Sequence, residues 1–145
     1  GYDIKTMMKG MEASFKKRNE ILTRVQNHEP VSNPELATIN ALESTVEMYD
    51  RGYSFAPLNV MTSQATQFSI DEKKNQVIPA LTSINGLGES VALQIIKARN
   101  EHPFTSVNDL MERAHVGQTM IEKLRSVNAL DGLPDDDQMT LFDML

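Results

Sequence analysis

Two glycines separated by one apolar residue, at Gly86-Leu87-Gly88, give this chain its clearest candidate for a ligand-binding site. Glycine lets the backbone turn with positive φ and places no side chain at the surface of the turn. The N–H groups of such a turn, together with the start of the helix expected to follow Glu89, can bind an anion. A phosphate of nucleic acid fits there without any base being read. We therefore predict that these four residues, with Lys97 farther along the helix, bind a phosphate backbone.

The residues around the two glycines follow the apolar-Gly-apolar-Gly pattern of a helix-hairpin-helix module. Ile84 precedes the first glycine, a short helix is expected over residues 79–83, and a longer apolar helix over 90–99. Arg99, at the end of that helix, would add positive charge. A dinucleotide-binding loop is a competing interpretation, but Val91 occupies the position of its third glycine and no buried strand precedes the first. A glycine turn between two core helices, without any ligand, is the other alternative.

A second pair of helices follows the first. Residues 104–113 and 119–127 have apolar residues at helical spacing, and the turn 114–117 separates them. This arrangement resembles the degenerate second member of a tandem helix-hairpin-helix unit. Because the second turn contains one glycine, Gly117, a phosphate contact there has less support than at the first turn. We include Gly117 among the predicted DNA-binding residues and expect this copy to serve chiefly in packing.

The last residues of the chain, Gln138-Met139-Thr140-Leu141-Phe142, carry large apolar side chains in a segment with no core of its own. Such exposed apolar groups usually mark a docking site. The Gln-x-x-Leu-Phe spacing resembles the pentapeptide by which bacterial DNA polymerases and repair proteins bind the sliding clamp. Two of its side chains, Leu141 and Phe142, would each contribute about 1.5–3 kcal/mol on full burial. The alternative is that these side chains fold back onto the domain. We assign clamp binding to Gln138, Met139, Leu141 and Phe142.

The composition restricts the chain to one domain, or to a small domain with appendages. Its 145 residues are 40% hydrophobic and contain no Trp and no Cys, which excludes disulfides and thiolate metal sites. The three histidines, His28, His102 and His115, are isolated and lack metal-ligand spacing, so we expect them to be surface or capping residues. No apolar run approaches the ~20 residues of a membrane span. We therefore expect no membrane partner and a cytoplasmic protein.

The net charge of −6 argues against tight binding of nucleic acid, but the charge is unevenly distributed. Residues 1–30 carry six basic and four acidic side chains, and residues 81–130 carry five of each, so the excess of acid lies in the middle and in the tail. A neutral body cannot bind DNA tightly by phosphate neutralisation. We expect weak DNA affinity for the isolated chain, and an acidic linker that keeps the end of the chain free in solution.

Helical patterns dominate the first half of the chain. Apolar residues recur at helical spacing over 4–28, where Asp3 is the expected N-cap and Gly10 a break, and again over 33–51. The second of these helices should be capped by Asn33, with Pro34 in its first turn. Segments 53–61, 65–70 and 76–78 favour short strands. The predicted fold class is mainly α with a small β element (α+β): a helical hairpin, short strands, a tandem helix-hairpin-helix module and a flexible C-terminal tail.

Taken together, these motifs resemble the C-terminal region of the C-family replicative polymerases, the α subunits of bacterial DNA polymerase III. The residues that follow the order and spacing of that family are Gly52-Tyr53-Ser54-Phe55-Ala56-Pro57-Leu58-Asn59-Val60, Ser63, Phe68, Ile84-Asn85-Gly86-Leu87-Gly88, Ile96-Lys97-Ala98-Arg99, Pro103-Phe104, Asp109-Leu110 and Leu130-Asp131. The opening Tyr2-Asp3-Ile4-Lys5-Thr6-Met7 with Lys9-Gly10, and the clamp motif at the end, are similar to the Gram-positive form, polymerase C.

The resemblance implies a C-terminal fragment of a DNA-copying nucleotidyltransferase. Residues 1–80 would belong to the end of the fingers, residues 81–131 to a module that binds duplex primer-template DNA, and residues 132–145 to an acidic linker and clamp-binding tail. The parent enzyme would use Mg²⁺ held by palm aspartates upstream, so the fragment itself should have no catalytic or metal site and no cofactor. Its partners would be duplex DNA and the β sliding clamp. A protein-interaction domain, in which only the tail binds a partner, is the alternative function.

Overall fold

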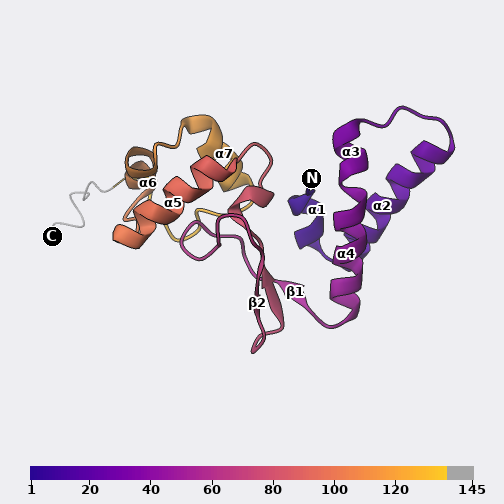
Figure 1. Cartoon of the computed structure of the whole chain (residues 1–145), viewed down its shortest axis with the longest axis horizontal. Helices are drawn as coiled ribbons and strands as arrows, with labels where there is room; N and C mark the ends of the chain where they lie inside the picture. Colours follow the sequence, from indigo (N-terminus) through magenta and orange to yellow (C-terminus); the bar gives the residue numbers. More distant parts are fainter. Residues whose placement is uncertain (137–145) are drawn as a thin grey trace.

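The computed structural model describes residues 1–136 and arranges them as two helical groups with a small sheet between them (Figure 1). In chain order the elements are α1 (Ile4–Lys9), α2 (Met11–Gln26), α3 (Asn33–Ala37), α4 (Ile39–Asp50), β1 (Ser54–Phe55), β2 (Ser69–Asp71), β3 (Gln76–Ile78), the 3-10 helix η1 (Leu81–Ser83), α5 (Glu89–Glu101), α6 (Val107–Ala114) and α7 (Gln118–Ser126). The first group contains α1–α4 and the second contains α5–α7. This architecture of the described residues confirms the predicted mainly α fold class with a small β element.

The first helical group is built on the packing of α2 along α4. Ile21 and Leu42 are fully buried between them, as expected for the apolar stripes of two amphipathic helices. Gly10, with φ of 130°, separates α1 from α2, and the Asp3 side chain caps α1 by accepting a hydrogen bond from the Thr6 N–H at 3.3 Å. Both of these features were predicted from the sequence.

The start of α3 differs from the prediction by one residue. Ser32, rather than Asn33, is the N-cap, because Glu35 three residues later completes a capping box with it. The single helix expected from this point is also interrupted at Thr38. The Thr38 hydroxyl donates to the Glu35 carbonyl at 2.6 Å, and such local side-chain bonds compete with the regular helical ladder. The result is the short α3 followed by α4.

The sheet is smaller than predicted. β3 lies between the other two strands, parallel to β1 and antiparallel to β2, with Val77 opposite both Phe55 and Ile70. The long first strand expected over 53–61 ends at Phe55. Its apolar residues are instead buried in an irregular segment, where the Val60 N–H donates to the Ala129 carbonyl at 3.0 Å. Residues 56–63 therefore connect the sheet to the C-terminal helices.

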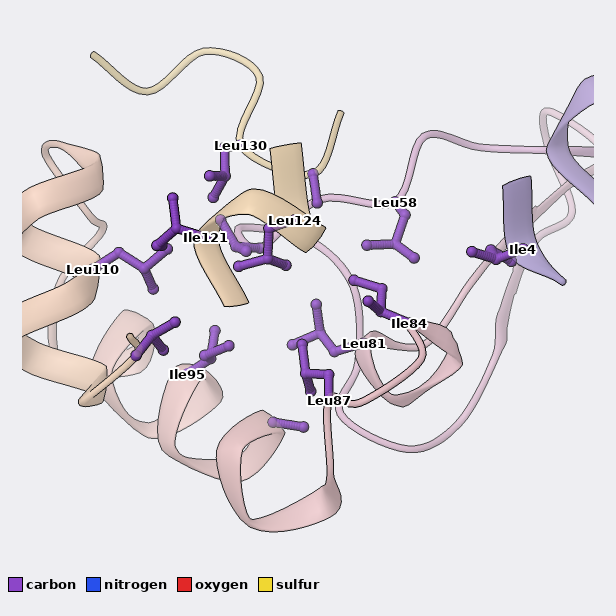
Figure 2. Packing of buried hydrophobic residues seen from close by; sticks show 14 of the residues in the cluster. Ile4, Leu58, Leu81, Ile84, Leu87, Ile95, Leu110, Ile121, Leu124 and Leu130 are labelled. Carbon is purple, nitrogen blue, oxygen red and sulfur yellow. The ribbon is translucent and has the colours of Figure 1, made fainter. Parts of the chain in front are cut away.

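The buried apolar side chains of the second helical group meet at one centre (Figure 2). Leu81, Ile95, Leu110, Ile121 and Leu124 are at most 1% exposed. This cluster also includes residues of the first group, such as Ile4 and Met7 of α1. The hydrophobic core thus extends across residue 80, where the sequence suggested a boundary between two regions.

Candidate nucleic-acid interface

The first hairpin connects η1 to α5 through a tight turn. Gly86 has φ of 86°, in the region that favours glycine. The Leu87 N–H donates to the Ile84 carbonyl at 3.1 Å, and the Leu87 side chain is only 3% exposed. Of the residues predicted here, Leu87 therefore anchors the turn in the core, and its N–H group is already used. Gly86, Gly88 and Glu89 are exposed at the surface.

The start of α5 offers unpaired backbone donors at this surface. Gly88 is the N-cap and provides no side-chain hydrogen bond to the helix. The first intrahelical bond runs from the Ala92 N–H to the Gly88 carbonyl, at 3.0 Å. The N–H groups of residues 89–91 lack intrahelical acceptors, as in the first turn of any α-helix. These N–H groups form the positive end of the helix dipole, where an anion such as a phosphate can bind.

The second hairpin repeats the backbone of the first. Gly117 is the N-cap of α7 with φ of −84° and ψ of 171°, close to the −80° and 169° of Gly88. Val116 is buried like Leu87, and His115 has a positive φ of 57° like Gly86. His115 is the C-cap of α6, which confirms a capping role for it. The second turn is therefore structurally equivalent to the first, although it contains one glycine fewer.

Three of the five basic residues in the region 81–130 are engaged within the fold. The Arg99 guanidinium donates to the carbonyls of Val60 and Ser63, at 2.9 and 2.6 Å, and its burial lowers its pKa. Our expectation that Arg99 adds free charge to the site was therefore wrong: because the irregular segment 56–63 lies over α5, Arg99 serves to hold that segment. Lys97 is exposed on α5, but it lies nine residues from Gly88, or ~13 Å along the helix.

The other two arginines are bound to nearby acids. Arg113 pairs with Asp109 at 2.8 Å and lies over the ring of Phe104, 5.0 Å from its centroid. Burial raises the pKa of Asp109, but hydrogen bonds from the Thr105 N–H and from Arg113 outweigh it, so that the pKa falls below its usual value. Arg125 pairs with Asp135 at 2.7 Å.

Lys123 is a basic residue that the sequence did not assign to the site. It belongs to α7, next to the second hairpin, but its side chain crosses to the first. A Cβ added to Gly86 would overlap with the Lys123 ammonium group, so the two are in direct contact. Only the packing of α7 against the first hairpin brings them together, and no local spacing in the sequence signals this contact.

The acidic segment that we expected to be flexible from residue 132 is attached to the module as far as Asp135. The carbonyls of Pro134 and Asp135 accept hydrogen bonds from the N–H groups of Val107 and Asn108, at 2.8 and 3.0 Å. These bonds satisfy donors at the start of α6. The predicted clamp-binding residues, Gln138, Met139, Leu141 and Phe142, lie outside the described residues.

Residues 1–136 contain no group of three or more His, Asp or Glu side chains that could hold a metal ion. No helix within these residues is long and apolar enough to cross a membrane. The exposed surface of the two hairpins, described above, is the candidate nucleic-acid interface.

Two successive helical pairs, each with a buried apolar residue in the turn and a glycine N-cap, define a tandem helix-hairpin-helix module. The chain belongs to the helix-hairpin-helix motif family, whose model matches residues 52–139. It is also homologous to a segment of PolC-type DNA polymerase III. The chain is 40% identical over 144 residues to the Streptococcus pneumoniae protein, covering 99% of this chain and 10% of that protein.

Two further relatives carry the same name. The PolC-type DNA polymerase III of Lactococcus lactis is 39% identical over 142 residues, covering 98% of this chain and 8% of that protein. The Ureaplasma parvum protein is 36% identical over 144 residues, with 97% and 10% covered. The chain thus spans about a tenth of the length of these relatives, and the similarity extends over nearly all of its own residues.

Proposed function

We propose that this chain is the C-terminal processivity region of a replicative DNA polymerase, and that its helix-hairpin-helix module binds the backbone of duplex DNA. One observation carries this proposal: the first hairpin presents exposed glycines and an uncapped helix start at one surface. These groups suit a phosphate and no particular base, as a polymerase that copies any sequence requires. Gly86, Gly88 and Glu89 would bind through backbone N–H groups, and Gly117 would provide the equivalent position in the second hairpin.

The second part of the proposal concerns the end of the chain. Gln138, Met139, Leu141 and Phe142 would bind the sliding clamp, with the Gln138 amide fixing the register and the two large apolar groups filling a pocket. Calorimetric titration with a bacterial sliding clamp tests this. We expect weak binding, in the micromolar range or above because a flexible pentapeptide must be ordered, and its loss in the variant with Leu141 and Phe142 changed to alanine. Absence of binding by the unmodified chain would contradict the assignment.

We infer that the DNA-copying activity belongs to the whole polymerase and that this segment positions DNA without reacting with it. The Mg²⁺ ions of the parent enzyme would be held by aspartates outside this chain. The described residues do not fit such a group, since no cluster of three carboxylates or histidines is present among them, and we derive no step through a metal. A replication protein of this kind would act in the cytoplasm.

The alternative function is a protein-interaction domain whose helix-hairpin-helix is only a scaffold. It is favoured by the balanced charge of residues 81–130 and by the engagement of Arg99, Arg113 and Arg125 within the fold. Retention on duplex DNA as a function of salt separates the two. A backbone-binding module loses affinity as salt rises, because each neutralised phosphate releases counterions. A scaffold that does not touch DNA shows no such slope.

A further inference from the structure

A pocket beside the first hairpin carries positive charge from two parts of the chain that are distant in sequence. It has a volume of about 260 Å³ and lies where α1, the first hairpin and α7 meet. Its polar lining comes from Asp3, Lys5, Asn85, Lys123 and Ser126. The two lysines belong to α1 and α7, so the pocket exists only in the folded chain.

The acidic and hydroxyl groups of the pocket are already used. The Asp3 carboxylate caps α1 and accepts hydrogen bonds from the Thr6 N–H and hydroxyl, at 3.3 and 2.7 Å. The Ser126 hydroxyl donates to the carbonyl of Lys123 at 2.7 Å. None of the salt bridges within residues 1–136 includes Lys5 or Lys123. Lys123 is thus a partly buried residue whose ammonium makes no salt bridge within the described residues, although the Asp3 carboxylate lines the same pocket.

An ammonium without a salt-bridge partner gains a charge-assisted hydrogen bond when an anion binds to it. The anion has a place here, because Lys123 contacts Gly86, and Gly86 lies two residues before Gly88, the N-cap of α5. By contrast, Lys97 lies ~13 Å along α5 from Gly88. The charge that the first hairpin lacks in its own sequence is supplied by α7.

We propose that Lys123 is a DNA-binding residue whose ammonium contacts the backbone phosphate bound at the first hairpin, with Lys5 adding to the positive potential at the same pocket. This inference rests on the proposed function, since it assumes that the hairpin binds duplex backbone. It assigns the second helix-hairpin-helix copy a part in binding at the first, in addition to packing. The contact is to a phosphodiester, so it is independent of base sequence.

The test is a fluorescence anisotropy titration of a labelled DNA duplex with the 145-residue chain, at several salt concentrations. The variants are Lys123→Gln, Gly88→Asp and a matched control, Lys74→Gln, which removes the same charge from the exposed turn between β2 and β3. Lys123→Gln should weaken binding by about tenfold at low salt, the loss of one charge-assisted contact. It should also reduce the salt slope by about one. Lys74→Gln should change neither quantity.

The outcomes separate this inference from the proposed function. If Lys123→Gln binds with unchanged affinity and slope while Gly88→Asp loses binding, Lys123 does not contact the phosphate, although the hairpin does. If the unmodified chain shows no salt-dependent binding, both are overturned. Should Lys123→Gln lose thermal stability, Lys123→Met preserves the apolar stem and is judged by the same two readouts.

Discussion

Replacing Gly88 by aspartate tests the phosphate site while leaving the fold intact. Gly88 has φ of −80° and ψ of 169°, an extended conformation that any residue adopts, and a Cβ added there meets no atom within 4 Å. Gly86 is a poorer site for this test because its φ of 86° strains any other residue. Aspartate is among the preferred N-cap residues and interacts favourably with the helix dipole. Gly88→Asp should therefore raise the free energy of unfolding, by up to about 1 kcal/mol.

The same substitution should weaken DNA binding. The new carboxylate would cap the N–H groups at the start of α5 and lie where the phosphate is proposed to bind. Two like charges ~5 Å apart repel by about 1 kcal/mol in water and by about 3 kcal/mol at an effective dielectric constant of ~20. The expected loss of duplex affinity is thus about fivefold to a hundredfold or more. Stability and binding would change in opposite directions, which a general loss of structure cannot produce.

The assay combines chemical denaturation with anisotropy titration of a labelled duplex at low salt. Gly88→Asn is the matched control, because asparagine has nearly the same size and caps the helix without a charge. We expect the asparagine variant to bind more tightly than the aspartate variant, with the difference shrinking as salt rises. An aspartate variant that is folded and binds duplex DNA as tightly as the unmodified chain would refute the phosphate-site reasoning.

Two further predictions concern stability. Arg99→Met should lower the free energy of unfolding by about 2–3 kcal/mol, because the carbonyls of Val60 and Ser63 lose a charged donor. The measurement is a urea titration. An unchanged unfolding midpoint would contradict this prediction and show that water replaces the guanidinium as donor. Glu35, bound to Arg24 at 2.8 Å, has its pKa lowered to about 2 by that hydrogen bond and by those from Ser32. Its contribution should be complete above about pH 4.5 and be lost as the pH falls toward 2, so the unmodified chain and Glu35→Gln should converge in stability over that range; a constant difference would contradict it.

The first hairpin was predictable from sequence because its requirement is local. Glycine is favoured where the turn needs a positive φ, as at Gly86, and it is also found at the exposed start of the next helix, as Gly88. The second hairpin has the same backbone, but its positive φ falls on His115. Histidine is one of the residues enriched in that conformation, and a search for paired glycines passes over it. The two hairpins share a residue with positive φ, then a buried apolar residue, then a glycine N-cap, and this repeated order is the signal that identifies the second hairpin.

The roles of the basic residues could not be predicted in the same way. Arg99 and Lys97 are neighbours on one helix, but Arg99 is covered by the irregular segment 56–63 while Lys97 faces solvent. Lys123 contacts Gly86 from a different hairpin. These differences depend on which segments pack over each helix face. The alternating pattern of 53–61 was likewise read as a strand, because burial on one side of an irregular segment gives the same alternation as a strand.

The attachment of the acidic segment affects how the two proposed contacts could act together: that of the hairpins with DNA, and that of the end of the chain with the clamp. Asp135 is held by Arg125 and by the start of α6, and Gln138 follows three residues later in the sequence. Three residues span at most ~10 Å. On the proposed function, a clamp bound at Gln138 would therefore be held close to the DNA-binding module. A short tether gives a high effective concentration, which compensates for a module whose basic residues are mostly committed to its own fold.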